Sequence, residues 1–267
     1  MPIYAPKGPA LEYAPLALNY YKGCGHNCKY CYVPGFLEMI GGKKVDSTLG
    51  LIGPTDATFD EKKKIFFRKL TNKAKKMKND KRRVLLSFTS DPYQPLEQEW
   101  RMTRRVLEIL GENNMKVTIL TKNPGMAISN DYDLIRRYDT ELATTIVWAS
   151  ETQRQIWEPN ASSIQSRVDA IWQAHKDGQK TWVSIEPIMD EKEALDVVDM
   201  LCGKTGKLKI GVVDPRWNPE IHKKIKWTDL LQKILKKVTA ANQRYYIKNK
   251  FWDYADANIK ANYKKEG

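Results

Sequence analysis

Six short apolar runs alternate with helical segments along most of the chain, and this alternation restricts the possible folds more than any other feature. The runs span residues 15–21, 83–88, 116–120, 142–148, 181–185 and 207–213. The segments between them include stretches with apolar residues at helical spacing. Strands that alternate with helices form parallel βαβ units with right-handed crossovers. The sequence therefore predicts an α/β fold with a barrel or partial barrel of parallel strands, and a doubly wound sheet is the alternative.

A chain of 267 residues suits one large domain or two small ones. We expect an N-terminal arm over residues 1–14, the barrel domain over 15–240, and a basic, aromatic, partly helical C-terminal extension over 241–267. No apolar run is long enough to span a membrane, and the first residues contain no apolar core of signal-peptide length. We therefore expect a cytoplasmic protein in a reducing compartment that does not engage the membrane.

The net charge of +13 favours partners that carry many phosphates, because lysine and arginine neutralise phosphates and release counterions. Eight lysines surround the apolar stripe of a helix predicted over 59–80. They form either a solvated face or a phosphate-contacting face. Trp252 and Tyr254 in the basic tail could stack on bases. The sequence thus predicts a nucleic-acid or nucleotide partner and salt-sensitive binding, although a generally lysine-rich proteome would give the same composition.

Unusual polar loops follow the predicted strands, at the end where barrels with parallel strands carry their function. They comprise the cysteine-rich stretch after the first strand and the segments 89–95, 121–122, 186–187 and 214–219. Asp91, which precedes a proline, either forms a turn or orients a substrate or a loop.

Three of the four cysteines lie within eight residues, with the spacing C-x3-C-x2-C at Cys24, Cys28 and Cys31. Structural zinc sites are almost always closed by four ligands, and ordinary iron–sulfur clusters take four cysteines. Three thiolates alone would leave one iron of a cubane free to bind another molecule. A zinc knuckle completed by His26 is less favoured, because one intervening residue is tighter than the usual zinc-ligand spacing. A disulfide framework is also disfavoured, since Cys202 is far away in the sequence.

The segment Cys24–Tyr32 resembles the cysteine motif of the radical S-adenosylmethionine (SAM) superfamily. Three further segments are similar to spore photoproduct lyase and its photolyase-like DNA repair relatives: Thr89-Ser90-Asp91, Thr121-Lys122 and Trp157-Glu158-Pro159. The resemblance covers about residues 15–215. It implies a partial (β/α)6 barrel, a [4Fe-4S] cluster on the three cysteines, cleavage of SAM to a 5′-deoxyadenosyl radical, and an electron donor such as flavodoxin or ferredoxin.

The resemblance also implies roles for single residues. We expect the cofactor-binding residues to be Tyr30, Ser90, Lys122, Thr145 and Glu186. The expected catalytic residues are Tyr32, which matches a family tyrosine tied to hydrogen-atom return, together with Tyr93 and Asp91.

One position departs from the family pattern. Phe88 stands where spore photoproduct lyase has the cysteine that returns a hydrogen atom, and Cys202 is predicted at a helix end on the opposite face. Thymine-dimer reversal by the same route is therefore in doubt, and another radical reaction on a nucleic-acid base or nucleotide is at least as compatible with the sequence. Two other functions remain open: a radical SAM enzyme that modifies a protein or small metabolite, and a metal-stabilised nucleic-acid-binding module without catalysis.

Overall fold

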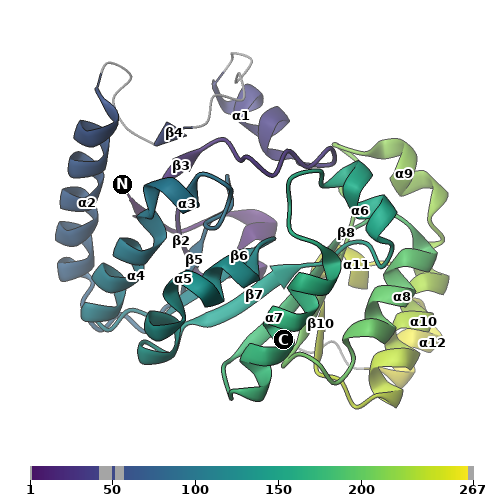
Figure 1. Ribbon diagram of the computed structural model, residues 1–267. Coiled ribbons are helices and arrows are strands. Elements are labelled where there is room, and N and C mark those ends of the chain that lie inside the picture. Colours follow the sequence, from purple (N-terminus) through teal and green to yellow (C-terminus); the bar gives the residue numbers. More distant parts are fainter. Residues whose placement is uncertain (1, 42–49, 52–56, 264–267) are drawn as a thin grey trace.

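The computed structural model describes residues 2–41, 50–51 and 57–263, and one large sheet organises them (Figure 1). Seven strands of this sheet run parallel, and the first strand, β1 (Ile3–Tyr4), pairs antiparallel with the second. The parallel strands are β2 (Leu16–Leu18), β5 (Val84–Leu86), β6 (Val117–Thr121), β7 (Glu141–Thr145), β8 (Thr181–Ile188), β9 (Leu208–Val212) and β10 (Tyr245–Ile247).

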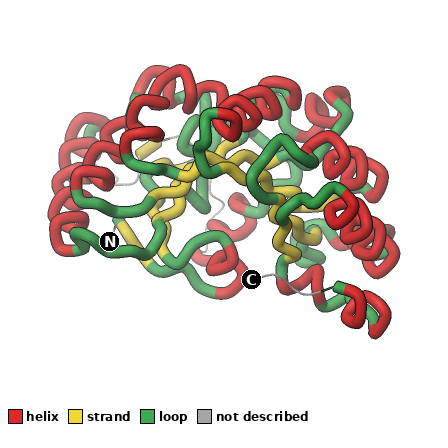
Figure 2. Tube along the Cα trace, turned by 90° about the horizontal axis from the view of Figure 1, so that it is seen from below, coloured by secondary structure: helices red, strands yellow, loops and turns green. Residues whose placement is uncertain are grey.

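The strand order is β1-β2-β5-β6-β7-β8-β9-β10, so each parallel strand pairs with the next parallel strand along the chain. A doubly wound sheet would reverse its order at a switch point, and this order has no reversal. Figure 2 shows that the sheet curves, with helices along its outer side. The fold is therefore the predicted partial barrel, and the doubly wound alternative is wrong.

Helices cover the outside of the sheet. A separate two-stranded antiparallel sheet is formed by β3 (Tyr21–Lys22) and β4 (Gly50–Leu51), and β3 follows β2 in the sequence. The helices are the 3-10 helix η1 (Gly8–Glu12) and α1 (Val33–Gly41), α2 (Phe59–Lys76), α3 (Glu97–Trp100), α4 (Met102–Glu112), α5 (Pro124–Arg137), α6 (Glu151–Trp157), α7 (Ile164–Lys176), α8 (Glu191–Leu201), α9 (Pro219–Lys224), α10 (Trp227–Ala240), α11 (Asn249–Trp252) and α12 (Ala257–Asn262). No helix in the described part of the chain is long and apolar enough to cross a bilayer.

The basic helix α2 begins at a capping box, in which Thr58 accepts the backbone N–H of Glu61 and the Glu61 carboxylate accepts that of Thr58. It buries only a narrow stripe of Phe66, Leu70 and Ala74. The lysines on the rest of its surface remain available to solvent or to phosphates, so both interpretations of this helix stay open.

One element differs from the sequence prediction, because the C-terminal segment contributes a seventh parallel strand, β10, before its two short helices. Helix α6 begins at the side-chain cap of Ser150. Helix α5 begins at Pro124 with Asn123 as its cap.

The packing of α4 against the end of α5 allows a sharp test. A Cβ at Gly111 would lie 2.3 Å from the ring Cγ of Tyr138. Glycine-to-alanine changes within a helix normally stabilise by up to about 1 kcal/mol. Here we expect Gly111→Ala to lower the free energy of unfolding by about 1–3 kcal/mol, because the ring must shift. Urea denaturation measures the change.

The matched background is Tyr138→Ala, in which Gly111→Ala should be neutral or stabilising, since the obstructing ring is gone. Equal stabilisation by Gly111→Ala in both backgrounds would contradict this packing.

Candidate active site

The three clustered cysteines lie in the loop between β3 and α1, on the side of the sheet that carries the carboxyl ends of the parallel strands. All three thiols are half-buried and free of disulfides. Positive φ angles at Gly23 (76°) and Asn27 (53°) let the loop turn tightly. Figure 1 shows this loop crossing the upper side of the sheet between α1 and α6.

Two other loops fasten the cysteine loop in place. The Gly25 amide donates to Gln94 Oε1 at 2.8 Å, and the Gly25 carbonyl accepts Asn160 Nδ2 at 3.0 Å. The Lys29 amide donates to the Trp157 carbonyl at 2.9 Å. The segments after β5 and after α6, which carried the family resemblance, are therefore the segments that hold the cysteine loop.

The carboxylate of Asp91, in the loop after β5, collects four contacts from neighbouring segments. Its Oδ1 accepts the Tyr93 amide at 2.8 Å and the Thr121 hydroxyl at 2.6 Å. Its Oδ2 accepts the Lys122 amide at 2.7 Å and lies 3.2 Å from His26 Nε2. Burial alone would raise the pKa of Asp91, but His26 and these hydrogen bonds hold the pKa below its ordinary value.

This geometry favours one of the roles that the sequence leaves open for Asp91. A carboxylate has about four lone-pair sites, and three of them accept protein hydrogen bonds here, with His26 beside the carboxylate. Asp91 therefore orients the loops around the site. His26 is buried, with Nδ1 at 3.2 Å from the Asn160 carbonyl and Nε2 at 3.2 Å from Asp91 Oδ2.

A second buried carboxylate, Glu158, joins the cysteine loop to the barrel. It accepts the Tyr30 hydroxyl, lies 2.6 Å from Arg167 Nη2 and 3.7 Å from Lys122 Nζ. Burial alone would raise the pKa of Glu158, but the two cations lower it below its ordinary value. Arg167 also donates to the carbonyl of Thr145 at 2.9 Å, which connects this network to the end of β7.

Lys122 is placed to influence the cysteines. Its ammonium lies 5.5 Å from the centre of the Tyr30 ring and only loosely pairs with Glu158, so donors remain available. Burial raises the pKa of the Cys28 thiol to about 12 and also raises that of Cys31, and the Lys122 charge opposes both shifts.

The donor set can be tested against the expected cluster. Because burial raises the pKa of all three thiols, Cys24 included, thiolates at these positions need a strong positive charge beside them. A metal cluster supplies that charge. Within the described ranges, no three His, Cys, Asp or Glu side chains converge as ligands of a single ion. Three neighbouring half-buried thiols in one loop have the chemistry to hold an iron–sulfur cluster, which would supply that charge.

The other expected residues lie around the same end of the barrel. Tyr32 is 40% exposed and donates its hydroxyl to the Phe88 carbonyl at 2.9 Å. The Ser90 hydroxyl is 3.0 Å from that of Ser87. Thr145 is buried at the end of β7. Each of these positions follows or ends a parallel strand, as the sequence predicts.

Glu186 lies in β8 and is already engaged. Lys248 Nζ donates to both of its carboxylate oxygens, at 2.8 and 2.7 Å, and the Tyr13 hydroxyl donates to one of them. Three of its approximately four lone-pair sites are thus used, which leaves one acceptor site for a ligand hydroxyl.

Tyr93 does not face this site. Its side chain is fully buried, and its hydroxyl donates to Asp131 Oδ2 at 2.9 Å, on the outer helix α5. Asp131 in turn lies 3.2 Å from Arg104 on α4. The aromatic ring and hydroxyl therefore tie the loop after β5 to the helical layer, and the expected catalytic role of Tyr93 is corrected to a structural one.

Sequence reasoning missed several residues that the fold brings here. Tyr13 and Lys248 come from the N-terminal arm and the C-terminal segment, where no motif marks them. Asn19 accepts the Phe88 amide at 2.9 Å and donates to the Tyr4 hydroxyl at 2.9 Å. Asn19 had a signal, since it directly follows the first barrel strand.

Comparisons with known proteins agree with this arrangement. No protein-family model matches the chain. It is 26% identical to an uncharacterized protein of Methanocaldococcus jannaschii over 76% of this chain and 70% of that protein. It is 25% identical to an uncharacterized protein of Acidianus two-tailed virus over 88% of this chain and 82% of that one.

Among solved structures, spore photoproduct lyase complexed with dinucleoside spore photoproduct superposes with a TM-score of 0.58 at 16% identity, over 88% of this chain and 76% of that one. The fold is that of the radical SAM enzymes. Streptococcus suis SuiB bound to its precursor peptide SuiA shares this fold with a TM-score of 0.57 at 12% identity, over 87% of this chain and 48% of that one.

The Asp91 contacts predict a pH-dependent stability effect. Asp91→Asn turns one acceptor oxygen into a donor that faces other donors, so we expect the free energy of unfolding at pH 7 to fall by about 1–3 kcal/mol. The lowered pKa of Asp91 means that its contribution is complete above the unfolded value of about 4 and is lost as the pH falls through the folded value.

Denaturant unfolding between pH 7 and pH 3 measures the difference in free energy of unfolding between the parent and Asp91→Asn. This difference should become smaller below about pH 4. Asp253→Asn, at an exposed carboxylate outside the site, is the control. A parent–variant difference that stays constant down to pH 3 would refute the assigned role.

Proposed function

We propose that the chain is a radical SAM enzyme that holds a [4Fe-4S] cluster through Cys24, Cys28 and Cys31. The observation that carries the proposal is the set of three half-buried thiols, beside Lys122 and Tyr30, at the carboxyl end of a barrel with the radical SAM fold. When bound, such a cluster supplies the electron that cleaves SAM to methionine and a 5′-deoxyadenosyl radical. Flavodoxin or ferredoxin is the class of reductant that we expect.

The surrounding residues have chemistry that suits SAM. The loosely paired Lys122 ammonium can bond the SAM carboxylate, and the Ser90 hydroxyl can bond its polar methionyl groups. Glu186 retains one acceptor site for a ribose hydroxyl. Thr145 lies at the end of β7, where its side chain would border the cofactor. Tyr30 packs beneath Lys122 and fixes its position through Glu158.

Tyr32 is the residue we assign to hydrogen-atom return. The cysteine that serves this purpose in spore photoproduct lyase is replaced by Phe88, and the Tyr32 hydroxyl lies 2.9 Å from the carbonyl of that same residue. Its side chain is the exposed phenol among the expected site residues, so a substrate can reach it. Cys202 caps the C-terminus of α8, outside this group of residues.

A nucleic-acid base or nucleotide is the substrate class that we favour. The net charge of +13 and the lysine face of α2 suit a phosphate backbone, and a base in a duplex would have to be extruded to reach the barrel end. One solved neighbour was bound to a dinucleoside lesion. A peptide substrate is the second candidate, because SuiB was bound to a precursor peptide.

The cluster proposal predicts a simple biochemical pattern. After anaerobic reconstitution with iron and sulfide, the parent protein should be brown and should form 5′-deoxyadenosine from SAM with dithionite. Alanine at Cys24, Cys28 or Cys31 should reduce this product to background, because each thiolate is a cluster ligand. Chromatography of the nucleoside product provides the measurement.

Cys202→Ala is the matched control and should behave as the parent. A colourless parent protein that holds one tetrahedral metal ion would eliminate the proposed enzyme.

The substrate proposal predicts isotope transfer. With an oligonucleotide deuterated on its bases, we expect deuterium in 5′-deoxyadenosine, because the radical takes a hydrogen atom from the substrate. Mass spectrometry of the nucleoside reads out the label. Reactions with Cys28→Ala and with unlabelled oligonucleotide are the controls. Uncoupled SAM cleavage without any label transfer would remove the nucleic-acid substrate and leave the cluster proposal standing.

A further inference from the structure

A second concave site lies at the opposite end of the barrel. Its cavity of about 640 Å³ is lined by residues at the amino ends of the parallel strands. Arg83 directly precedes β5, Glu141 begins β7, Lys207 precedes β9 and Arg244 precedes β10. The cysteine loop, Asp91 and Lys122 all follow carboxyl ends instead, so this pocket is separate from the candidate active site.

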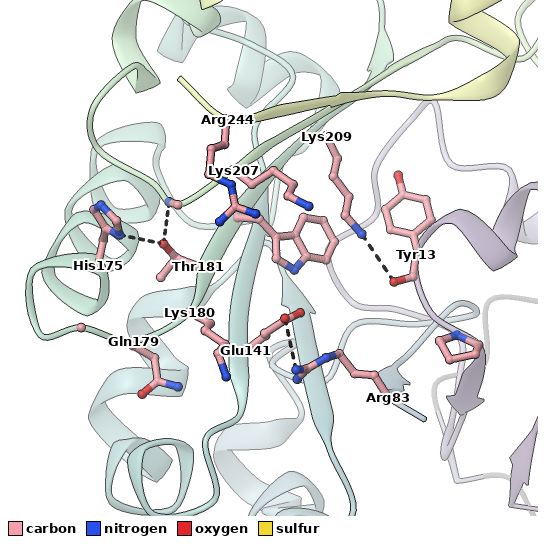
Figure 3. Close-up of a pocket in the computed structure, with 14 residues that line it drawn as sticks. Tyr13, Arg83, Glu141, His175, Gln179, Lys180, Thr181, Lys207, Lys209 and Arg244 are labelled. Atoms are coloured by element: carbon pink, nitrogen blue, oxygen red, sulfur yellow. Dashed lines mark hydrogen bonds and ion pairs between the residues drawn. The ribbon is translucent and has the colours of Figure 1, made fainter. Parts of the chain in front are cut away.

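Positive charge dominates the lining of this pocket. Two of its cations are paired, because Arg83 lies 3.3 Å from Glu141 and Lys180 lies 2.6 Å from Asp139. Glu141 is the single carboxylate among the lining residues. Figure 3 shows the side chains of Lys207, Lys209 and Arg244 gathered on one side of the pocket, with Arg83 and Glu141 on the other.

Three cations remain without a carboxylate. Within the described ranges, no salt bridge forms at Lys207, Lys209 or Arg244. Lys209 Nζ donates only weakly, to the carbonyls of Glu12 and Tyr13 at 3.3 and 3.4 Å. Burial, opposed by the negative charge of Glu141 and assisted by the positive charge of Lys207, lowers the pKa of Lys209 to about 8. A neighbouring anion would stabilise the charged form of this lysine.

The same pocket contains an unpaired buried donor. Trp182 lines it and is 4% exposed, and among the described residues its indole Nε1–H has no hydrogen-bond partner. Lys209 Nζ lies 4.2 Å from the centre of the Trp182 ring. Buried donors without partners are rare and cost free energy. An acceptor oxygen in the cavity would be stabilised by the neighbouring cations, and a small shift of the indole would bring its N–H to the same oxygen.

We propose that this pocket binds a phosphate group presented by a nucleotide or by a nucleic-acid backbone. Lysine, arginine and an indole N–H are all donors without acceptor capacity, which suits phosphate oxygens and excludes cationic ligands. The cavity is large enough for a nucleotide by the usual volumes of ligand sites. A solvated basic face would not enclose its cations in a cavity of this size, so it accounts for the observations less well. This proposal does not rest on the proposed radical chemistry.

The test measures binding of three probes by calorimetry: inorganic phosphate, adenosine 5′-monophosphate and a short single-stranded oligonucleotide. The variant Lys207→Gln with Arg244→Gln removes two free cations at solvent-accessible positions. We expect it to weaken binding by about tenfold or more, because charge-assisted contacts are lost. Trp182→Phe keeps the ring and removes the N–H, and should weaken binding by about threefold.

The control is Lys233→Gln with Lys236→Gln, which removes the same charge from the exposed face of α10. Loss of mononucleotide binding in the pocket variant alone supports a nucleotide ligand. Loss confined to the oligonucleotide supports a nucleic-acid backbone. Equal binding of all probes by parent and pocket variant, or equal losses in pocket and control variants, overturns the proposal.

Formation of 5′-deoxyadenosine by the pocket variant should match the parent. If neither the parent nor the pocket variant cleaves SAM, and the pocket variant still loses phosphate binding, the proposed function fails and the phosphate site stands.

Discussion

The buried carboxylate of Asp91 is the contact on which the candidate active site depends. It joins the loop after β5, the end of β6 and the cysteine loop, through Tyr93, Lys122 and His26. Glu158 is likewise a buried carboxylate held by protein donors, and it contacts the cysteine loop through Tyr30. A buried carboxylate is stable only when protein donors compensate its lost hydration. The cysteine loop is consequently held by contacts that need every neighbouring loop in its native place, which preorganises the site before any ligand binds.

The two ends of the barrel carry opposite chemistry. The carboxyl ends carry thiols, an exposed phenol and buried carboxylates, whereas the amino ends carry unpaired cations. Tyr13 lies between them: its hydroxyl donates to Glu186, and its ring lines the basic pocket beside Trp182. Tyr13 of the N-terminal segment therefore lies between the two sites and contacts residues of both.

Much of this arrangement follows from local sequence. Strand–helix alternation predicts the partial barrel, and polar loops after apolar runs predict the end at which the cysteines, Ser90 and Lys122 lie. The remainder depends on tertiary contacts. Strand β10 is three residues long and pairs only with β9, so no periodicity marks it. Tyr93 was misassigned because a tyrosine in a functional loop can point inward or outward, and its partner Asp131 is distant in sequence.

Strand β10 also has a consequence for the order of folding. Each parallel strand adds to a neighbour that precedes it in the chain, so the sheet can grow from the N-terminus during synthesis. Lys248 arrives only with β10, and until then the Glu186 carboxylate lacks its cation. Strand β10 thus completes the charge balance inside the barrel, and a chain without it would leave this acid unneutralised.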